Sequence, residues 1–200
     1  EAVDHADNKT IKLLESTALE AAIDTKGKSF ILDLNGKTIE GENGTAIEHN
    51  GGMLNIEDNV GGGMIVSKGT YSTIKLMNDS RLIVTGGTIS YANGDASAIH
   101  HDSTGSLELN GGTVENTYTY TNLGRKVIYS TGSGDIIVDG GTVRFNQNDP
   151  YINSTVIYND SDGDIIVSEG TVEGLAGRVI ANYGNGDVSI SGGTVKSLSE

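Results

Sequence analysis

The 200-residue chain has no cysteine, no tryptophan and a single proline. The absence of cysteine excludes disulfide bonds and thiol catalysis. Basic residues are also few, 13 against 27 acidic ones, which gives a formal net charge of −14. Nucleic acids and anionic membranes are therefore poor partners, since both would be repelled. No apolar run is long enough to cross a bilayer, so we expect no membrane insertion.

Glycine, by contrast, is abundant, with 29 residues, and much of it belongs to a phrase that recurs seven times. Each copy has an apolar-x-apolar triplet, a small polar residue, glycine, and then threonine followed by isoleucine or valine; residues 82–89 and 107–114 are the clearest. The threonine position is occupied by Thr38, Met64, Thr88, Thr113, Thr142, Thr171 and Thr194. A repeat that cannot bury its own apolar face must stack on its neighbours, which predicts a solenoid.

A second repeated position lies upstream of each phrase and is always isoleucine. It is occupied by Ile23, Ile47, Ile74, Ile99, Ile128, Ile157 and Ile180. In the last five copies this isoleucine precedes the triplet by 8 positions, although the total period varies. The variation therefore lies in the loop after the phrase, which is longest, at 14 positions, from Val114 to Ile128 and again from Val143 to Ile157.

Three short strands are predicted per coil, around the isoleucine, at the triplet and at the threonine, because β-branched residues alternate there with turn residues. Period-two alternation directs the outer residues of each triplet into the core and the middle residue to solvent. The middle residues are Asp33, Asn55, Ile83, Glu108, Ile137, Ile166 and Ser189. Stacking in register would also place Glu115, Arg144, Glu173 and Lys196 in one outward column of alternating charge.

These glycine-threonine repeats resemble those of the right-handed parallel β-helix in pectate-lyase-like proteins, in particular bacterial cell-surface domains of the adhesin type. The resemblance covers about residues 22–200. It implies an all-β, right-handed parallel β-helix of about seven three-stranded coils. It also implies that the long loops and the first strand frame a polysaccharide groove, and that the protein is secreted to a bacterial cell surface.

The two ends of the chain depart from the repeat. Residues 10–14 are expected to lay a strand over the open core, so we interpret residues 1–21 as an N-terminal cap and 22–200 as one repeat domain. The last repeat stops close to Glu200 without a segment that resembles a cap. Because an uncapped parallel edge favours aggregation, we expect the chain to be a piece of a longer protein.

The main candidate for ligand binding lies where the two longest loops meet. The outward residue beside the isoleucine is tyrosine in two successive coils, which predicts a two-rung aromatic ladder of Tyr129 and Tyr158. Aromatic rings suit the apolar faces of sugars, and polar side chains suit their hydroxyls. The predicted site comprises Tyr118, Tyr120, Arg125, Lys126, Tyr129, Asn148, Asp149, Tyr151 and Tyr158. The alternative is that the tyrosines only stabilise the sheet and cover the loops.

A second candidate is a calcium site. Asp160, Asp162 and Asp164 alternate along one turn, and Asp135 has the position of Asp164 in the preceding coil. Carboxylate oxygens are the ligands that Ca²⁺ prefers, and a cation would relieve their mutual repulsion. Glycine-aspartate pairs are also ordinary turn residues. Calcium is the only cofactor that the sequence suggests.

His100, His101 and Asp102 look catalytic at first sight, but strand alternation turns the two histidines to opposite sides. We interpret them, and His49, as surface and turn histidines. The sequence thus predicts a non-enzymatic domain for surface adhesion or carbohydrate binding, with a glycan as partner. Two alternatives stay open: a purely structural stalk or spacer, and a fragment of a polysaccharide lyase or glycoside hydrolase, for which we find no cluster of three converging groups.

Overall fold

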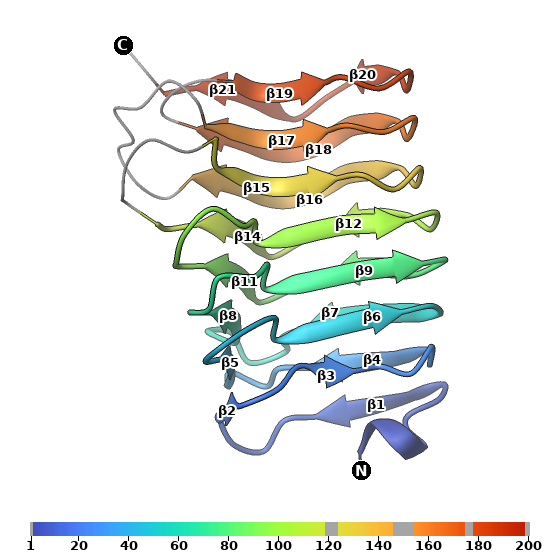
Figure 1. The fold of residues 1–200 in the computed structure, drawn as a ribbon, viewed down its shortest axis with the longest axis vertical. Helices are drawn as coiled ribbons and strands as arrows, with labels where there is room; N and C mark the ends of the chain where they lie inside the picture. Colours follow the sequence, from blue (N-terminus) through green and yellow to red (C-terminus); the bar gives the residue numbers. More distant parts are fainter. Residues whose placement is uncertain (1, 119–123, 146–153, 175–177, 199–200) are drawn as a thin grey trace.

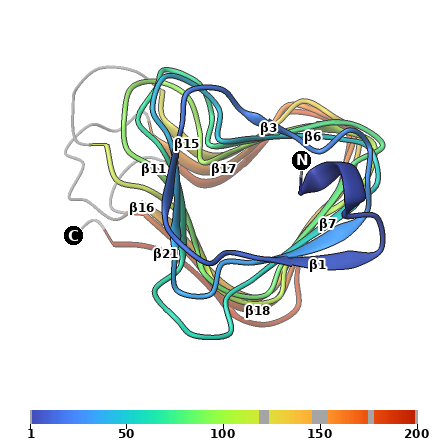
Figure 2. The same cartoon turned by 90° about the horizontal axis from the view of Figure 1, so that it is seen from below.

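The chain forms an all-β parallel solenoid of about seven turns, seen from the side in Figure 1 and along its axis in Figure 2. This computed structural model describes residues 2–118, 124–145, 154–174 and 178–198. The only helix in those ranges is the short 3-10 helix η1 (Val3–His5). The strands stack along the axis, so each coil contacts mainly the coil before it and the coil after it, as the repeat predicts.

One sheet has seven strands and is built on the repeated isoleucine; we call it the first-strand sheet. Its strands are β3 (Ile23–Asp24), β6 (Ile47–Asn50), β9 (Ile74–Asn78), β12 (Ile99–Ser103), β15 (Lys126–Ser130), β17 (Thr155–Asn159) and β19 (Arg178–Asn182). Every pair of neighbours is parallel and sets one repeated isoleucine opposite the next, as in Ile99 opposite Ile128. The predicted alignment of the isoleucines is confirmed.

The triplet strands and the threonine strands form two rows of the 14-stranded sheet. The triplet row contains β1 (Lys9–Lys12), β4 (Phe30–Asp33), β7 (Met53–Glu57), β10 (Arg81–Val84), β13 (Leu107–Leu109) and β20 (Val188–Ile190). The threonine row contains β2 (Thr17–Leu19), β5 (Thr38–Gly41), β8 (Met64–Ser67), β11 (Thr88–Tyr91), β14 (Thr113–Asn116) and β21 (Thr194–Ser197). Two long strands, β16 (Ile136–Phe145) and β18 (Ile165–Gly174), bend through both rows.

The core is one continuous stripe of aliphatic side chains enclosed by the three rows. Ile74, Leu82, Val84 and Ile89 from a single coil are all fully buried, and the same positions recur in the neighbouring coils. Each such side chain contributes about 1.5–3 kcal/mol when it is removed from water. Burial of this narrow stripe explains how a chain with only 36% hydrophobic residues can form a stable solenoid.

The register prediction was wrong in the first coil. We expected Leu32 to begin the triplet, with Asp33 facing solvent, but Phe30 is opposite Leu54 and Leu32 is opposite Ile56. The outward residue of this strand is therefore Ile31. Asp33 lies beyond the triplet, where it is buried and accepts a hydrogen bond from the backbone N–H of Asn35 at 2.9 Å.

The column of alternating charge is confirmed. Arg144 lies opposite both Glu115 and Glu173 in the strand register. Arg144 Nη2 lies 3.0 Å from Glu115 Oε2, and Lys196 Nζ lies 3.0 Å from Glu173 Oε2. Pairs of this exposure add about 0–1 kcal/mol each, so their main effect is to favour the in-register stacking over a shifted one.

The N-terminal segment continues the coils rather than crossing the core. Strand β1 pairs with β4, with Ile11 opposite Leu32, and β2 pairs with β5. The strand that was expected over the open core therefore lies in register beside the first coil, on its N-terminal side (Figure 1). The end of the core is approached instead by η1 and the residue after it: Ala6 is buried and Val3 packs against the core cluster (Figure 2).

A column of glycines forms the corner between the first-strand sheet and the triplet row. Gly105, Gly134, Gly163 and Gly186 follow one another along the axis. A methyl group built on Gly134 would lie 2.0 Å from the carbonyl oxygen of Gly105, and one on Gly163 would lie 2.3 Å from that of Gly134. Successive coils are only about 4.8 Å apart. The corner therefore has no room for any side chain that points along the axis.

Candidate ligand-binding face

The outward face of the first-strand sheet carries the predicted aromatic column. Tyr129 of β15 lies opposite Tyr158 of β17, and His100 of β12 lies opposite Tyr129. The side chains alternate along each strand, so these rings face solvent while the isoleucines beside them face the core. We call His100, Tyr129, Tyr158 and Tyr183 the aromatic ladder.

The rings of the ladder contact one another. The centroids of His100 and Tyr129 are 5.1 Å apart with an interplanar angle of 14°, a stacked pair. Tyr129 and Tyr158 meet edge to face at 5.6 Å, and Tyr158 and Tyr183 meet at 5.0 Å with a tilt of 33°. Pairs of this geometry contribute about 0.5–1.5 kcal/mol each beyond their buried area. The ladder is thus an ordered row of rings with half-exposed edges and hydroxyl tips.

Lys126 lies across two rings of the ladder. Its Nζ is 4.8 Å from the ring centroid of Tyr129 and 5.0 Å from that of Tyr158, which is cation–π geometry. Burial lowers the pKa of Lys126, against the opposing effect of the carboxylates of Asp95 and Asp160. The face therefore presents an ammonium donor, phenol hydroxyls and aromatic edges side by side.

Sequence reasoning missed two of the four rings. His100 was interpreted as a surface or turn histidine and was not joined to the ladder, although its register next to Tyr129 required it. Tyr183 was not counted as part of the ladder because it lies one residue beyond β19 and is not paired with any residue of β17. The signal was present: Ala181 faces outward opposite Tyr158, and period-two alternation returns Tyr183 to the same side. Arg178 lies 5.9 Å from the centre of that ring and donates a hydrogen bond to the Tyr183 hydroxyl.

Of the other residues of the predicted site, Arg125 is not presented on this face. Arg125 is 1% exposed, and its guanidinium donates to the backbone carbonyl of Tyr118. It is therefore buried rather than presented to a ligand, which corrects the expectation of a surface contact. Tyr118 is half-buried, and its backbone N–H donates to the side chain of Asn116 at 3.0 Å. Tyr120, Asn148, Asp149 and Tyr151 lie outside the described residues.

The four aspartates of the predicted calcium site are not brought together. Within the described ranges, no group of three or more histidine or carboxylate side chains could hold a metal ion. The carboxylate of Asp135 instead accepts the backbone N–H of Asp164 at 2.9 Å, and that of Asp164 accepts the N–H of Asp187 at 2.7 Å. Asp162 accepts from Asn185, and Asp160 is exposed. These carboxylates bond to the next coil, so they fix the stacking of the turn.

The role of Asp164 can be tested by substitution. Replacing Asp164 by alanine is expected to lower the free energy of unfolding by about 1 kcal/mol, because the N–H of Asp187 loses its acceptor. Replacement by asparagine is expected to recover most of the loss, since an amide oxygen also accepts. Urea unfolding measures both values. A calcium site would instead make the stability depend on the metal. Addition of Ca²⁺ would raise the melting temperature of the unmodified protein, and Asp164→Asn would abolish that rise.

The interpretation of His49 and His101 as surface or turn histidines was wrong. Both are fully buried at the corner of the core. His101 Nε2 lies 2.7 Å from the carbonyl oxygen of Gly105, and His49 Nε2 lies 3.1 Å from that of Gly52. A carbonyl oxygen only accepts, so in both rings Nε2 carries the proton. The Nδ1 atoms lie 3.0 Å from Ser130 Oγ in His101 and 2.9 Å from Thr25 Oγ1 in His49.

The polar position of these histidines is repeated in every coil but one. The residue two after the repeated isoleucine is Thr25, His49, Leu76, His101, Ser130, Asn159 or Asn182. Asn159 Nδ2 donates to the carbonyl of Gly163 at 2.8 Å, as His101 does to Gly105. The column therefore satisfies buried turn carbonyls, which would otherwise cost about 1–3 kcal/mol each. This is a structural role, and it leaves neither histidine accessible for catalysis.

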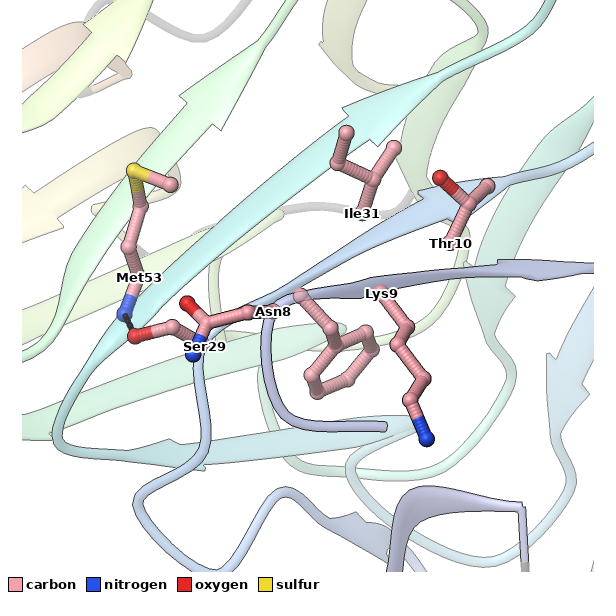
Figure 3. A pocket seen from close by; sticks show the side chains of 7 residues that line it. Asn8, Lys9, Thr10, Ser29, Ile31 and Met53 are labelled. Atoms are coloured by element: carbon pink, nitrogen blue, oxygen red, sulfur yellow. Dashed lines mark hydrogen bonds between the residues drawn. The ribbon is translucent and has the colours of Figure 1, made fainter. Parts of the chain in front are cut away.

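A hollow of about 320 Å³ lies at the N-terminal edge, between β1 and β4 (Figure 3). Asn8, Lys9 and Met53 are among its lining residues, and the backbone N–H of Met53 donates to Ser29 Oγ at 3.0 Å. Lys9 is the only ionisable residue that lines it. The hollow therefore does not offer a pair of groups for acid–base chemistry.

Comparisons with protein-family models, curated proteins and solved structures find no match to this chain. In the part of the chain that the structure describes, no helix has both the length and the apolar character needed to span a membrane.

Proposed function

We propose that the domain is a non-enzymatic carbohydrate-binding module, of the pectate-lyase-like adhesin type, in a secreted bacterial protein. Its binding face is the aromatic ladder with Lys126, and its partner is a glycan. The observation that carries the proposal is the unbroken row of four aromatic rings on the outer face of the first-strand sheet. A ladder longer than a single ring pair gives an extended surface, as a polymeric ligand requires.

The chemistry of the face suits a neutral glycan. Aromatic edges and phenol hydroxyls provide apolar area and hydrogen-bond groups together, the combination by which proteins bind sugars. Lys126 and the Tyr129 and Tyr158 hydroxyls supply donors to sugar oxygens. An anionic polymer is less suitable because the chain as a whole carries a formal charge of −14.

A glycan array with purified protein tests the proposal. The double variant Tyr129→Ala/Tyr158→Ala is expected to lose at least ~100-fold in affinity for any glycan that the unmodified protein binds, because two central contacts are removed together. Tyr129→Phe/Tyr158→Phe keeps the rings and removes only the hydroxyls, so it should retain part of the affinity.

The matched control is Tyr71→Ala. Tyr71 is 65% exposed but lies at a hollow lined by Glu48 and Lys75, toward the N-terminal end of the same sheet. This variant is expected to bind as the unmodified protein does. Circular dichroism and urea unfolding establish that each variant is folded. Equal binding by the unmodified protein and the folded double alanine variant would exclude the ladder as the binding face.

A spacer role is the second candidate, because the rings cover one another. A face of Tyr129 is stacked on His100, so part of the aromatic area is used within the sheet. If the ladder serves only the fold, Tyr129→Ala/Tyr158→Ala should lose about 1–3 kcal/mol of stability and the unmodified protein should bind no glycan. The same array and unfolding measurements therefore separate the two functions.

A further inference from the structure

The chain contains six asparagine-glycine pairs, and the structure makes one of them chemically different. They are Asn35-Gly36, Asn43-Gly44, Asn50-Gly51, Asn93-Gly94, Asn110-Gly111 and Asn185-Gly186. In such a pair the backbone nitrogen of glycine can attack the side-chain amide carbon of asparagine. A new N–C bond forms, ammonia leaves, and a five-membered succinimide results. Water then opens the ring at either carbonyl, which gives aspartate or isoaspartate.

This reaction requires that the glycine nitrogen and the asparagine amide are both free to approach each other. A glycine N–H that donates a hydrogen bond is held in place, and an asparagine amide that donates one is held away. The hydrogen bonds around each pair therefore decide which asparagine can react while the protein is folded.

Three of the pairs are blocked at the glycine nitrogen. Gly36 N donates to Asp58 Oδ1 at 2.7 Å, and Gly51 N donates to Ser80 Oγ at 2.7 Å. Gly111 N donates to the carbonyl of Val84 at 3.1 Å. All three bonds join one coil to another, so they belong to the stacking of the solenoid and open only when the coils separate.

Two further pairs are blocked at the asparagine side chain. Asn93 Nδ2 donates to the carbonyl of Lys68 at 2.6 Å, and Asn185 Nδ2 donates to Asp162 Oδ1 at 2.8 Å. Asn185 is held a second time, because its backbone N–H lies 3.2 Å from the same carboxylate oxygen. The reactive carbon of each is thereby fixed to the preceding coil.

The pair Asn43-Gly44 has neither restraint. Asn43 is exposed in the loop between β5 and β6, and in the described part of the chain neither its amide nor the Gly44 N–H has a hydrogen-bond partner. A methyl group built on Gly44 would meet nothing within 4 Å. The carbonyl of Gly44 accepts a hydrogen bond from Ser67 Oγ at 2.6 Å, and Gly69 packs against the Asn43–Gly44 peptide without hydrogen-bonding to its N–H. We infer that Asn43 is a site of spontaneous deamidation and isoaspartate formation in the folded protein.

The modification changes the charge and the backbone of one loop. Each event replaces a neutral amide by a carboxylate, next to Glu42, and isoaspartate lengthens the main chain by one methylene. The loop connects the threonine row to the first-strand sheet, where loop length varies most between coils, so the solenoid is expected to accept the change without unfolding.

The test follows all six asparagines by peptide mapping and mass spectrometry during incubation of the folded protein at mildly alkaline pH. Asn43 is expected to convert at least about ten-fold faster than Asn110, since the latter must first break a hydrogen bond. In urea, where the coils separate, the six sites should convert at similar rates. Conversion of Asn110 or Asn185 as fast as Asn43 in the folded protein would overturn the inference, as would an unchanged Asn43.

Two variants complete the test. Gly44→Ala adds a methyl group into open space, so the fold is retained, but the methyl hinders ring closure and should slow conversion of Asn43 in both the folded and the urea-unfolded chain. Asn43→Gln should remove most isoaspartate from the folded protein. Asn110→Gln is the matched control and should leave the total unchanged; a large decrease with Asn110→Gln would contradict the assignment.

Discussion

Replacing Gly134 by alanine is expected to destabilise the protein by about 3 kcal/mol or more. The added methyl group would lie 2.0 Å from the backbone oxygen of Gly105, and the glycine above, Gly163, approaches Gly134 in the same way. Neither neighbour is a flexible side chain, so the coils themselves must move apart. Urea unfolding followed by circular dichroism measures the change in the free energy of unfolding.

Gly44→Ala provides the matched control for this substitution. It adds the same methyl group at a glycine whose surroundings are open and whose φ is not left-handed. Its effect should stay within about 0.5 kcal/mol, or be slightly stabilising because alanine restricts the unfolded chain. If the two alanine variants unfold at the same urea concentration, the close approach of coils at the glycine corner is not what limits stability.

The stability of the protein is expected to fall steeply as the pH drops below about 6.5. Burial lowers the pKa of both His49 and His101, although the carbonyls of Gly52 and Gly105 oppose the effect. In the unfolded chain histidine titrates near 6.5, so the unfolded state binds protons first and is favoured as the pH falls. The stabilisation is complete above that pH and decreases until the folded-state pKa values are reached. The slope approaches about 1.4 kcal/mol per pH unit for each histidine.

Unfolding in urea at a series of pH values between about 5 and 8 checks this slope, before most carboxylates begin to titrate. His101→Asn is the informative variant, because Asn159 occupies the same column and makes the same bond to its turn carbonyl. The double variant with His49→Asn should lose the part of the pH dependence that comes from the two buried rings, while His100, whose pKa burial also lowers, keeps its own contribution. Nearby carboxylates oppose the lowering of both histidine pKa values. Asp79 acts on His49, and Asp102 and Asp135 act on His101. His5→Asn, at an exposed position, is the control; an unchanged slope in the double variant would disprove the assignment to the buried pair.

The architecture could be predicted from the sequence because the repeat fixes both the strand positions and their alignment. Identical spacing from isoleucine to triplet leaves one way to stack the coils, and Ile99 opposite Ile128 follows from it. Tyr129 opposite Tyr158 follows for the same reason. The first coil failed because Leu32-Asp33-Leu34 fits the apolar-x-apolar pattern as well as Phe30-Ile31-Leu32 does. Because Leu34 is buried as well, although it follows the strand, the apolar-x-apolar pattern alone does not show which of the two triplets forms the strand.

The corner histidines could not be read in the same way. Alternation predicted correctly that His100 and His101 face opposite sides, but it does not say that the inner side of a corner contains carbonyls in need of donors. Once the turn glycines are known to crowd together, the polar residue found two positions after the isoleucine in every coil but one is explained. The burial of Arg125 was equally hidden, because Arg125 lies outside the repeated positions and the repeat does not determine its surroundings.

The loop between the threonine row and the first-strand sheet differs in length from coil to coil, while the corner between the first-strand sheet and the triplet row is nearly constant. Extra residues at this junction therefore leave the stacking of the neighbouring coils untouched. A foreign peptide grafted between Gly41 and Ile47 would be displayed beside the same sheet as the aromatic ladder. Insertions in this loop can therefore add new binding residues, by evolution or by engineering, while the stacked coils remain unchanged.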